Sequence, residues 1–147
     1  MLPFLNLVQC TASGWPATLL LLIVKTNTQR MTNLERASAL YQQVGQGQIL
    51  EAFEQYYANN VVMEEPRGIR EGKDACRASE QQFVDSVEAF HGMDVKAMAE
   101  DANTGKVLIE VAMDVTFKGG SRVQMDQTAV QTWENGQIVH ERFYYNQ

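Results

Sequence analysis

The sequence has little of what several protein classes require. Only two cysteines and two histidines occur among 147 residues, and no Cys-x-x-Cys motif is present. This scarcity argues against a disulfide framework and against a structural zinc site, which needs four such ligands. The simplest interpretation of the two thiols is a leader thiol, Cys10, and a buried thiol in a helix, Cys76. We expect no metal and no other cofactor.

Positive charge is also scarce. Twelve Lys and Arg residues stand against eighteen Asp and Glu residues, which gives a net charge of −6 and a pI of about 4.9. A nucleic-acid backbone needs clustered basic side chains, and an anionic membrane surface needs the same. The balance therefore argues against nucleic acid and against a membrane as partners. With 45% hydrophobic residues, a chain of this length is expected to form one core.

The first thirty residues differ from the rest, and we treat 1–30 as a leader of doubtful status before a domain at 31–147. The leader holds two basic residues and no acidic one, and its apolar run at 17–24 is too short to span a bilayer. Both positive charges follow that run, whereas an export signal has them before it. We favour translation from Met31 and a cytoplasmic protein. A cleaved export signal and a membrane anchor are the alternatives.

Helical periodicity dominates the first half of the domain. Apolar residues recur every three or four positions, as on one face of a helix. Three segments share this pattern: 33–46, 49–57 and 73–90. Thr32 or Asn33 is expected to cap the first helix, and His91-Gly92 to close the third. A short strand at 61–65, stopped by Pro66, precedes the third helix.

After residue 92 the hydrophobic period changes to two. Residues 93–101 form a predicted strand, and apolar residues alternate with mostly polar ones over 107–117. Gly119-Gly120 and Asn135-Gly136 mark two hairpin turns. Helices are thus followed by an antiparallel meander. The predicted fold class is α+β, with N-terminal helices packed on a curved antiparallel sheet.

Three strings occur in a characteristic order. They are GQILEAFEQYYANNVVMEEP at 47–66, REGKD at 70–74, and WENGQIV at 133–139 with Phe-Tyr-Tyr at 143–145. Together they resemble the nuclear transport factor 2-like superfamily, and within it the SnoaL-like and ketosteroid-isomerase-like domains. The resemblance covers about residues 32–147 and implies a cone-shaped α+β barrel with a deep pocket, often forming a homodimer through the outer sheet face. The superfamily includes isomerases, cyclases, dehydratases and binding proteins, so the fold alone does not define function.

The resemblance also implies roles for single residues. Ketosteroid isomerases carry a general-base Asp just before a Pro at the end of the first strand, and Glu65 matches that position. Their first-helix Tyr, which hydrogen-bonds the substrate oxygen, matches Tyr41. Their second oxyanion donor, a protonated Asp on a late strand, falls at Ala129 or Val130, where no such donor exists. This departure argues against ketosteroid isomerisation itself.

Strand pairing follows from the hairpins if both have two-residue loops. Met113 then lies opposite Asp126, and Asp126 opposite Tyr145, so these side chains share the inner face with Glu141. A bulged three-residue loop at the second turn would replace Asp126 by Gln127; we favour the first register and keep both open. The outer face, where we expect dimerisation, then carries these less polar residues: Ala112, Met125, Ala129, Trp133 and Ile138.

Three carboxylates, Glu65, Asp126 and Glu141, are therefore expected to point into one cavity. Burial in an apolar wall raises the pKa of a carboxyl group, as general acid or base catalysis near neutrality requires. The leading hypothesis is a small enzyme of isomerase, cyclase or dehydratase type that acts on a small hydrophobic organic molecule. Glu65 is its predicted base, and Tyr41 or a protonated Asp126 its oxyanion donor. The predicted substrate contacts are Glu141, Tyr145, Met63 and Met113.

Two other functions stay open at this point. A non-catalytic ligand-binding or dimeric assembly module would keep the family pocket without using it for chemistry. An epoxide-hydrolase-like enzyme would use a carboxylate–arginine pair. An open cavity with convergent carboxylates favours an enzyme, whereas an interior filled by side chains favours a module.

Overall fold

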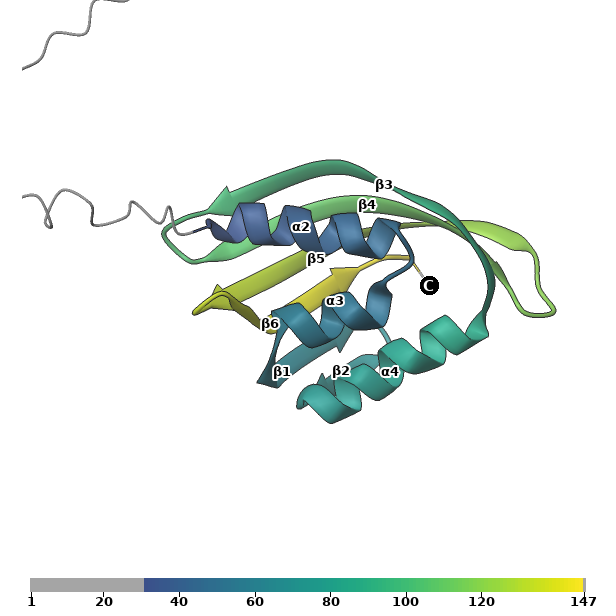
Figure 1. Cartoon of the computed structure of the whole chain (residues 1–147), viewed down its shortest axis with the longest axis horizontal. Helices are drawn as coiled ribbons and strands as arrows, with labels where there is room; N and C mark the ends of the chain where they lie inside the picture. Colours follow the sequence, from purple (N-terminus) through teal and green to yellow (C-terminus); the bar gives the residue numbers. More distant parts are fainter. Residues whose placement is uncertain (1–30, 147) are drawn as a thin grey trace, which may run out of the picture. The chain divides into compact units, whose positions relative to one another are not determined.

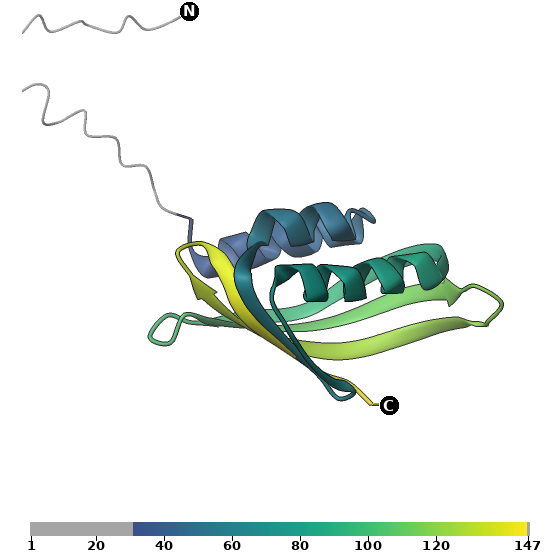
Figure 2. The same ribbon diagram turned by 90° about the horizontal axis from the view of Figure 1, so that it is seen from below.

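The computed structural model describes residues 31–146, and the expectations for residues 1–30 lie outside that range. Within it, three helices lie on one face of a curved six-stranded sheet (Figures 1 and 2). The elements are α2 (Asn33–Gly45), α3 (Ile49–Tyr56), β1 (Tyr57–Glu65), β2 (Gly68–Glu71), α4 (Lys73–Ser86), β3 (Val87–Asp101), β4 (Lys106–Phe117), β5 (Arg122–Glu134) and β6 (Gln137–Tyr144). The predicted α+β class is confirmed. No helix between residues 31 and 146 is long and apolar enough to cross a membrane.

The sheet has the order β2-β1-β6-β5-β4-β3, so the meander of β3 to β6 occupies most of its width. All neighbours pair antiparallel except β1 and β6, which run parallel. The predicted antiparallel sheet is thus mixed, and it stays open, with β2 and β3 at its edges. Its curvature creates a concave face, which the three helices cover (Figure 2).

The first two helices begin and end where their sequences predict. The Thr32 hydroxyl accepts a hydrogen bond from the backbone of Glu35, and the Glu35 carboxylate accepts one from the backbone of Thr32. This reciprocal capping box satisfies two donors that a helix start leaves free. On α3, Phe53 is buried and stacks on Tyr57 with ring centroids 4.4 Å apart. Both helices bury their apolar faces against the sheet.

Helix α4 ends earlier than predicted, at Ser86. The last part of the expected inner stripe, Val87 and Phe90, belongs to strand β3 instead, where Phe90 pairs with Val115. His91 is therefore not a helix cap; its Nε2 lies 2.8 Å from the Thr116 hydroxyl. A helical repeat and a strand cannot be distinguished over so few apolar residues, and the long ladder with β4 determines the outcome. Cys76, earlier on α4, is fully buried, as predicted.

Strand β1 is longer than predicted and continues into a hairpin that the sequence analysis missed. Residues 66 and 67 turn the chain, and β2 then pairs back on β1, with Glu65 opposite Gly68 and Met63 opposite Arg70. Pro66 therefore does not simply stop the strand. It forms part of a turn that brings Arg70 onto the same face as the end of β1.

The two predicted hairpins differ in outcome. Glu134 pairs with Gln137 at the second turn, as predicted, but the ladder shifts between Thr132 and Trp133. At the first turn the connection is one residue longer than predicted, so Met113 pairs with Met125 and not with Asp126. A shift of one residue exchanges the two faces of a strand.

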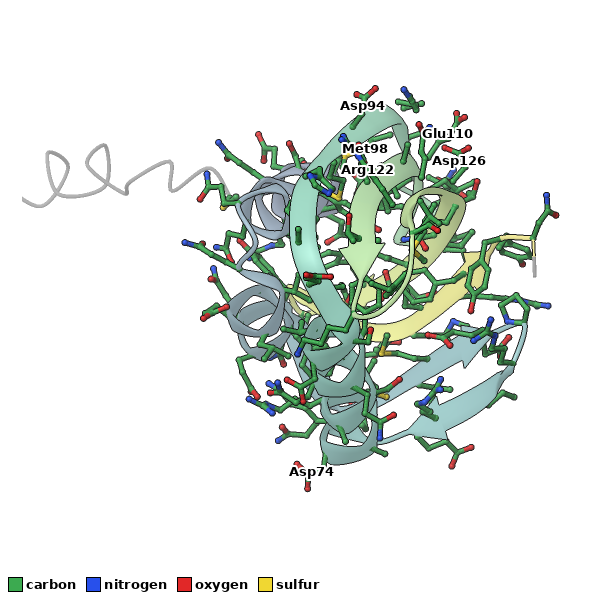
Figure 3. All side chains as sticks on the ribbon, turned by 90° about the vertical axis from the view of Figure 1, so that its right-hand side faces the viewer. Asp74, Asp94, Met98, Glu110, Arg122 and Asp126 are labelled. Atoms are coloured by element: carbon green, nitrogen blue, oxygen red, sulfur yellow. The ribbon has the colours of Figure 1, made fainter. Side chains whose placement is uncertain are left out.

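The favoured register was therefore wrong for β5, and the Gln127 alternative describes the inner face correctly. Asp126 is exposed and points away from the helices, beside Glu110 (Figure 3). Three residues that we assigned to the outer face lie in the core: Ala129, Trp133 and Ile138. Met125 lines the cavity described below. Only Ala112 keeps its predicted outward direction, opposite Asp126.

Candidate functional site

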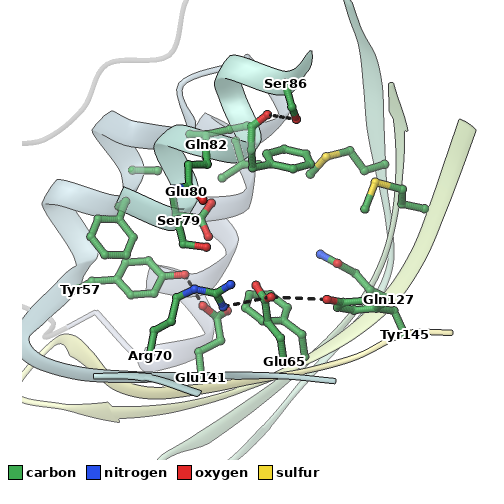
Figure 4. Close-up of a pocket in the computed structure, with 18 of the residues that line it drawn as sticks. Tyr57, Glu65, Arg70, Ser79, Glu80, Gln82, Ser86, Gln127, Glu141 and Tyr145 are labelled. Carbon is green, nitrogen blue, oxygen red and sulfur yellow. Dashed lines mark hydrogen bonds and ion pairs between the residues drawn. The ribbon is translucent and has the colours of Figure 1, made fainter. Parts of the chain in front are cut away.

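A cavity of about 510 Å³ lies between the inner face of the sheet and the helices α2, α3 and α4. Its wall is largely aromatic and apolar, with four phenylalanines: Phe53, Phe83, Phe117 and Phe143. Three glutamates from three different elements also line it: Glu65 of β1, Glu80 of α4 and Glu141 of β6 (Figure 4). The interior is thus an open cavity with convergent carboxylates.

Glu141 is the most buried of these glutamates, with 1% of its surface exposed. Its Oε2 accepts a hydrogen bond from the Tyr57 hydroxyl at 2.5 Å, and its Oε1 accepts one from Gln131 Nε2 at 2.8 Å. Burial raises the pKa of the Glu141 carboxyl to about 7, because a charge in an apolar interior loses its hydration. The two hydrogen bonds oppose this increase, and the nearby Glu65 charge adds to it.

Glu80 is the site residue that the sequence analysis missed. It is half-buried and points from α4 toward the middle of the cavity (Figure 4). Burial, and then the negative charges of Glu141 and Glu65, raise the pKa of its carboxyl to about 7. A signal existed: Glu80 lies four residues after Cys76 and three before Phe83, on the inward stripe of the helix. A glutamate on an otherwise apolar stripe is the pattern that identifies it.

Glu65 is the last residue of β1 and has a different environment. Its Oε2 lies 3.2 Å from Arg70 Nη1, and the Tyr145 hydroxyl donates to the same oxygen at 3.5 Å. The side chains of Glu65 and Arg70 are 20% and 34% exposed. The β1–β2 hairpin creates this ion pair, because it places Arg70 beside the strand that carries Glu65.

The other predicted site residues divide into two groups. Tyr41, Met113 and Tyr145 line the cavity as expected. Burial, and then the charges of Glu141 and Glu80, raise the pKa of the Tyr41 hydroxyl well above its usual value, so it stays protonated. Met63 is 2% exposed and packs in the core without lining the cavity. Asp126 lies on the opposite face of the sheet, where its carboxylate accepts from Gln124 at 3.1 Å.

The sequence profile of the SnoaL-like domain matches residues 31–145, nearly the whole described part of the chain. The chain belongs to the SnoaL-like domain family. This confirms the resemblance inferred from the three strings. A search of curated proteins gave no match.

Several solved structures share the fold of this chain. A proposed SnoaL-like polyketide cyclase from Mesorhizobium loti is 32% identical, with a TM-score of 0.68 over 78% of this chain and 100% of that one. A proposed isomerase from Bacillus subtilis is 19% identical, with a TM-score of 0.69 over 79% of this chain and 90% of that one. TerC, co-crystallised with polyporic acid, is 14% identical, with a TM-score of 0.66 over 78% and 91%. The last two share the fold alone.

Proposed function

We propose that this SnoaL-like protein is a proton-transfer enzyme of isomerase, cyclase or dehydratase type. Its substrate is a small, mainly apolar organic molecule with an oxygen group that gains charge during the reaction. The observation that carries the proposal is the pair Glu80 and Glu141, two carboxyls with pKa values of about 7 that line one cavity. Carboxyls of this kind take up and release protons near neutral pH.

The surroundings of the two glutamates assign them different roles. Glu141 accepts hydrogen bonds from Tyr57 and Gln131, which favour its ionised form, so we assign it as the general base. The Glu141 charge in turn raises the pKa of Glu80, which therefore keeps its proton and can donate to a substrate oxygen. Burial and the Glu141 charge both raise the pKa of Glu80, so the two carboxyls titrate as an interacting pair.

Glu65, the base expected from the resemblance, receives a different role in this proposal. Its carboxylate already pairs with Arg70 in a partly exposed ion pair. We assign the Glu65–Arg70 pair to substrate orientation and to stabilising negative charge at the open end of the cavity. The Tyr41 hydroxyl, also in the wall, is a further donor available to the substrate.

The reaction then has two balanced steps. Glu141 takes a proton from a C–H next to a carbonyl, and the electron pair moves onto the carbonyl oxygen as an enolate. The Glu80 O–H and the Arg70 charge stabilise that oxygen. In cyclisation the enolate carbon attacks a second carbonyl carbon, whose oxygen takes the electron pair and then the proton held by Glu141. In elimination the enolate expels a β-leaving group, which departs with the bonding pair and takes that proton. In isomerisation Glu141 returns the proton to a different carbon of the enolate.

The size and lining of the cavity support a small organic substrate. Ligand pockets of about 300–1,000 Å³ with apolar walls and a few polar groups are typical of small-molecule sites. The cavity described here has that size, and its lining combines apolar and aromatic side chains with three glutamates, two arginines and other polar groups. The Mesorhizobium loti relative is a proposed polyketide cyclase, and TerC was crystallised with polyporic acid; an organic substrate for this chain agrees with both.

A generic proton-abstraction probe tests the proposal without knowledge of the natural substrate. In 5-nitrobenzisoxazole a base removes the C3 proton, the N–O bond breaks, and a coloured cyanonitrophenolate forms. We expect the protein to accelerate this ring opening, and Glu141→Gln to reduce the acceleration by about 100-fold or more. Glu71→Gln, at an exposed position of β2, is the matched control and keeps the rate. Equal rates for Glu141→Gln and the unmodified protein would contradict the proposal.

We also propose that two copies pair through the outer face of the sheet. Leu108 and Tyr144 alternate with inward residues on β4 and β6, so they point outward. Both side chains are large and hydrophobic, and they are 43% and 49% exposed in one chain. Leu108 lies beside Val130 across the β4–β5 ladder. Burying such side chains favours association. Light scattering should give twice the 16.6 kDa of one chain, and Leu108→Glu should give a single chain. A single chain for the unmodified protein would contradict this.

A further inference from the structure

Three buried side chains form a hydrogen-bonded chain that ends at the cavity. The Trp133 indole Nε1 donates to Gln131 Oε1 at 3.1 Å, and Gln131 Nε2 donates to Glu141 Oε1 at 2.8 Å. Their exposed fractions are 4%, 0% and 1% in that order. Neither Trp133 nor Gln131 lines the cavity, and their hydrogen bonds reach it through Glu141.

The indole group gives this chain a fixed direction. An indole N–H can donate a hydrogen bond but cannot accept one. The Gln131 carbonyl must therefore face Trp133, and its NH₂ group must face Glu141. If the amide turned over, two N–H groups would meet at Trp133 and two oxygens would meet at Glu141. Only a protonated Glu141 would then satisfy the contact, so the observed direction favours an ionised Glu141.

Tyr57 also favours the ionised form of Glu141, but none of the other charged and titratable groups around Glu141 holds it with a fixed hydrogen-bond direction. Tyr57 donates to Oε2 and can reverse its hydroxyl, because a hydroxyl both donates and accepts. Glu80 is a competing acid, Glu65 is paired with Arg70, and the Cys76 thiol donates to the backbone oxygens of Val61 and Arg70. Tyr41 stays protonated. Among the contacts to Glu141, the hydrogen bond from Gln131 is the one whose direction the core fixes.

We propose that Trp133 is a positioning residue which, through Gln131, makes Glu141 rather than Glu80 the ionised member of the glutamate pair. Trp133 thereby determines which glutamate takes a proton and which one donates. The proposal rests on the proposed function for its effect on turnover, whereas the charge assignment itself can be measured without any substrate.

The test is a pH titration of the full chain with ¹³C-labelled glutamate side chains, followed by NMR. Glu80→Gln and Glu141→Gln assign the two resonances. In the unmodified protein we expect Glu141 to ionise before Glu80 as the pH rises. Trp133→Phe frees the amide to turn over, so the Glu141 midpoint should rise by about one pH unit, the effect of losing one hydrogen bond to the charged form. The Glu80 midpoint should fall in response.

A matched control separates the indole N–H from packing. Tyr56 packs edge-to-face on Trp133, with the two ring centroids 6.1 Å apart. Tyr56→Leu therefore loosens the packing around Trp133 but keeps its indole N–H. This variant should leave the Glu141 midpoint unchanged. If Trp133→Phe does not fold, benzothienylalanine at position 133 in a Trp15→Phe background replaces the N–H with sulfur and keeps the ring shape. An unchanged Glu141 midpoint in the folded donor-free protein would overturn the proposal.

The outcomes for this inference and for the proposed function are distinguishable. A shifted midpoint together with full ring-opening activity in Glu141→Gln would support the role of Trp133 and contradict the enzymatic proposal. An unchanged midpoint together with lost activity in Glu141→Gln would do the reverse.

Discussion

Two glutamates on neighbouring strands of one cavity have opposite surroundings. Glu65 ends β1 beside the Arg70 guanidinium, in a partly exposed ion pair. Glu141 lies inside β6, and its two donors, Tyr57 and Gln131, are neutral. Neutral donors in an apolar wall leave the Glu141 proton exchangeable near neutral pH, because burial raises its pKa to about 7. This difference is the reason for proposing Glu141, and not the strand-end Glu65, as the general base.

The largest expected difference is in turnover of the benzisoxazole probe. Glu141→Gln should lower kcat/KM by about 100-fold or more, since it removes the base. Glu65→Gln should lower it by at most about tenfold, because a partly exposed ion pair contributes about 1 kcal/mol. Steady-state kinetics of the two variants measures this directly. Equal losses would remove the distinction between the two glutamates.

The second prediction concerns the shape of the pH profile. In the unmodified protein kcat/KM should rise as Glu141 ionises and fall as Glu80 loses its proton, so the profile is a bell centred near pH 7. Glu80→Gln keeps an N–H donor but cannot titrate. It should lower the maximum by about tenfold, the effect of a weakened hydrogen bond, and abolish the fall at high pH. A bell retained in Glu80→Gln would assign the falling limb to another group.

The third prediction concerns stability. The ordinary glutamate value is 4.5, while the pKa of Glu141 in the folded protein is about 7. Between these values the folded chain binds more protons than the unfolded chain, so stability falls as the pH rises from 4.5 to 7. The loss from Glu141 is on the order of 3 kcal/mol. Urea unfolding at pH 5 and pH 8 should show this decrease, and Glu141→Gln should reduce it. Stability that increases over this interval in the unmodified protein would contradict burial as the main influence on Glu141.

The smallest effect is expected outside the cavity. Asp126→Asn should change neither turnover nor the free energy of unfolding by more than about 0.5 kcal/mol, because the side chain is exposed. Gln127→Leu, one residue further and lining the cavity, should alter the KM for the probe. If Asp126→Asn instead abolished turnover, the predicted register with Asp126 inside would be correct.

The sequence predicts the fold well because most elements carry an unambiguous period. Helix α2 has a capping box, and β4 alternates over most of its length, so local and tertiary preferences agree there. The boundary between α4 and β3 was wrong, because Val87 and Phe90 fit both a helix and a strand. Strand β2 is only four residues long and lacks an apolar pattern, so its position depends on pairing with β1.

The site was predicted less completely than the fold. Glu65, Tyr41 and Glu141 line the cavity as expected. The resemblance indicated Glu65 and Tyr41, and strand pairing indicated Glu141. Asp126 was misplaced, because a one-residue difference in a glycine turn changes the face of every later residue in the strand. The roles of Arg70 and Gln131 depend on the exact register of the β1–β2 and β5–β6 hairpins, which no periodicity reveals.

The measurement that tests the central claim most directly is the carboxyl ¹³C titration of the unmodified protein. The account predicts that two glutamate resonances titrate near pH 7 and that one disappears in Glu80→Gln and the other in Glu141→Gln. It also predicts that addition of a ligand that fills the cavity shifts both midpoints. If every glutamate instead titrates below about pH 5, the ordinary range of the side chain, the cavity holds no proton-transfer pair and the proposed function is wrong.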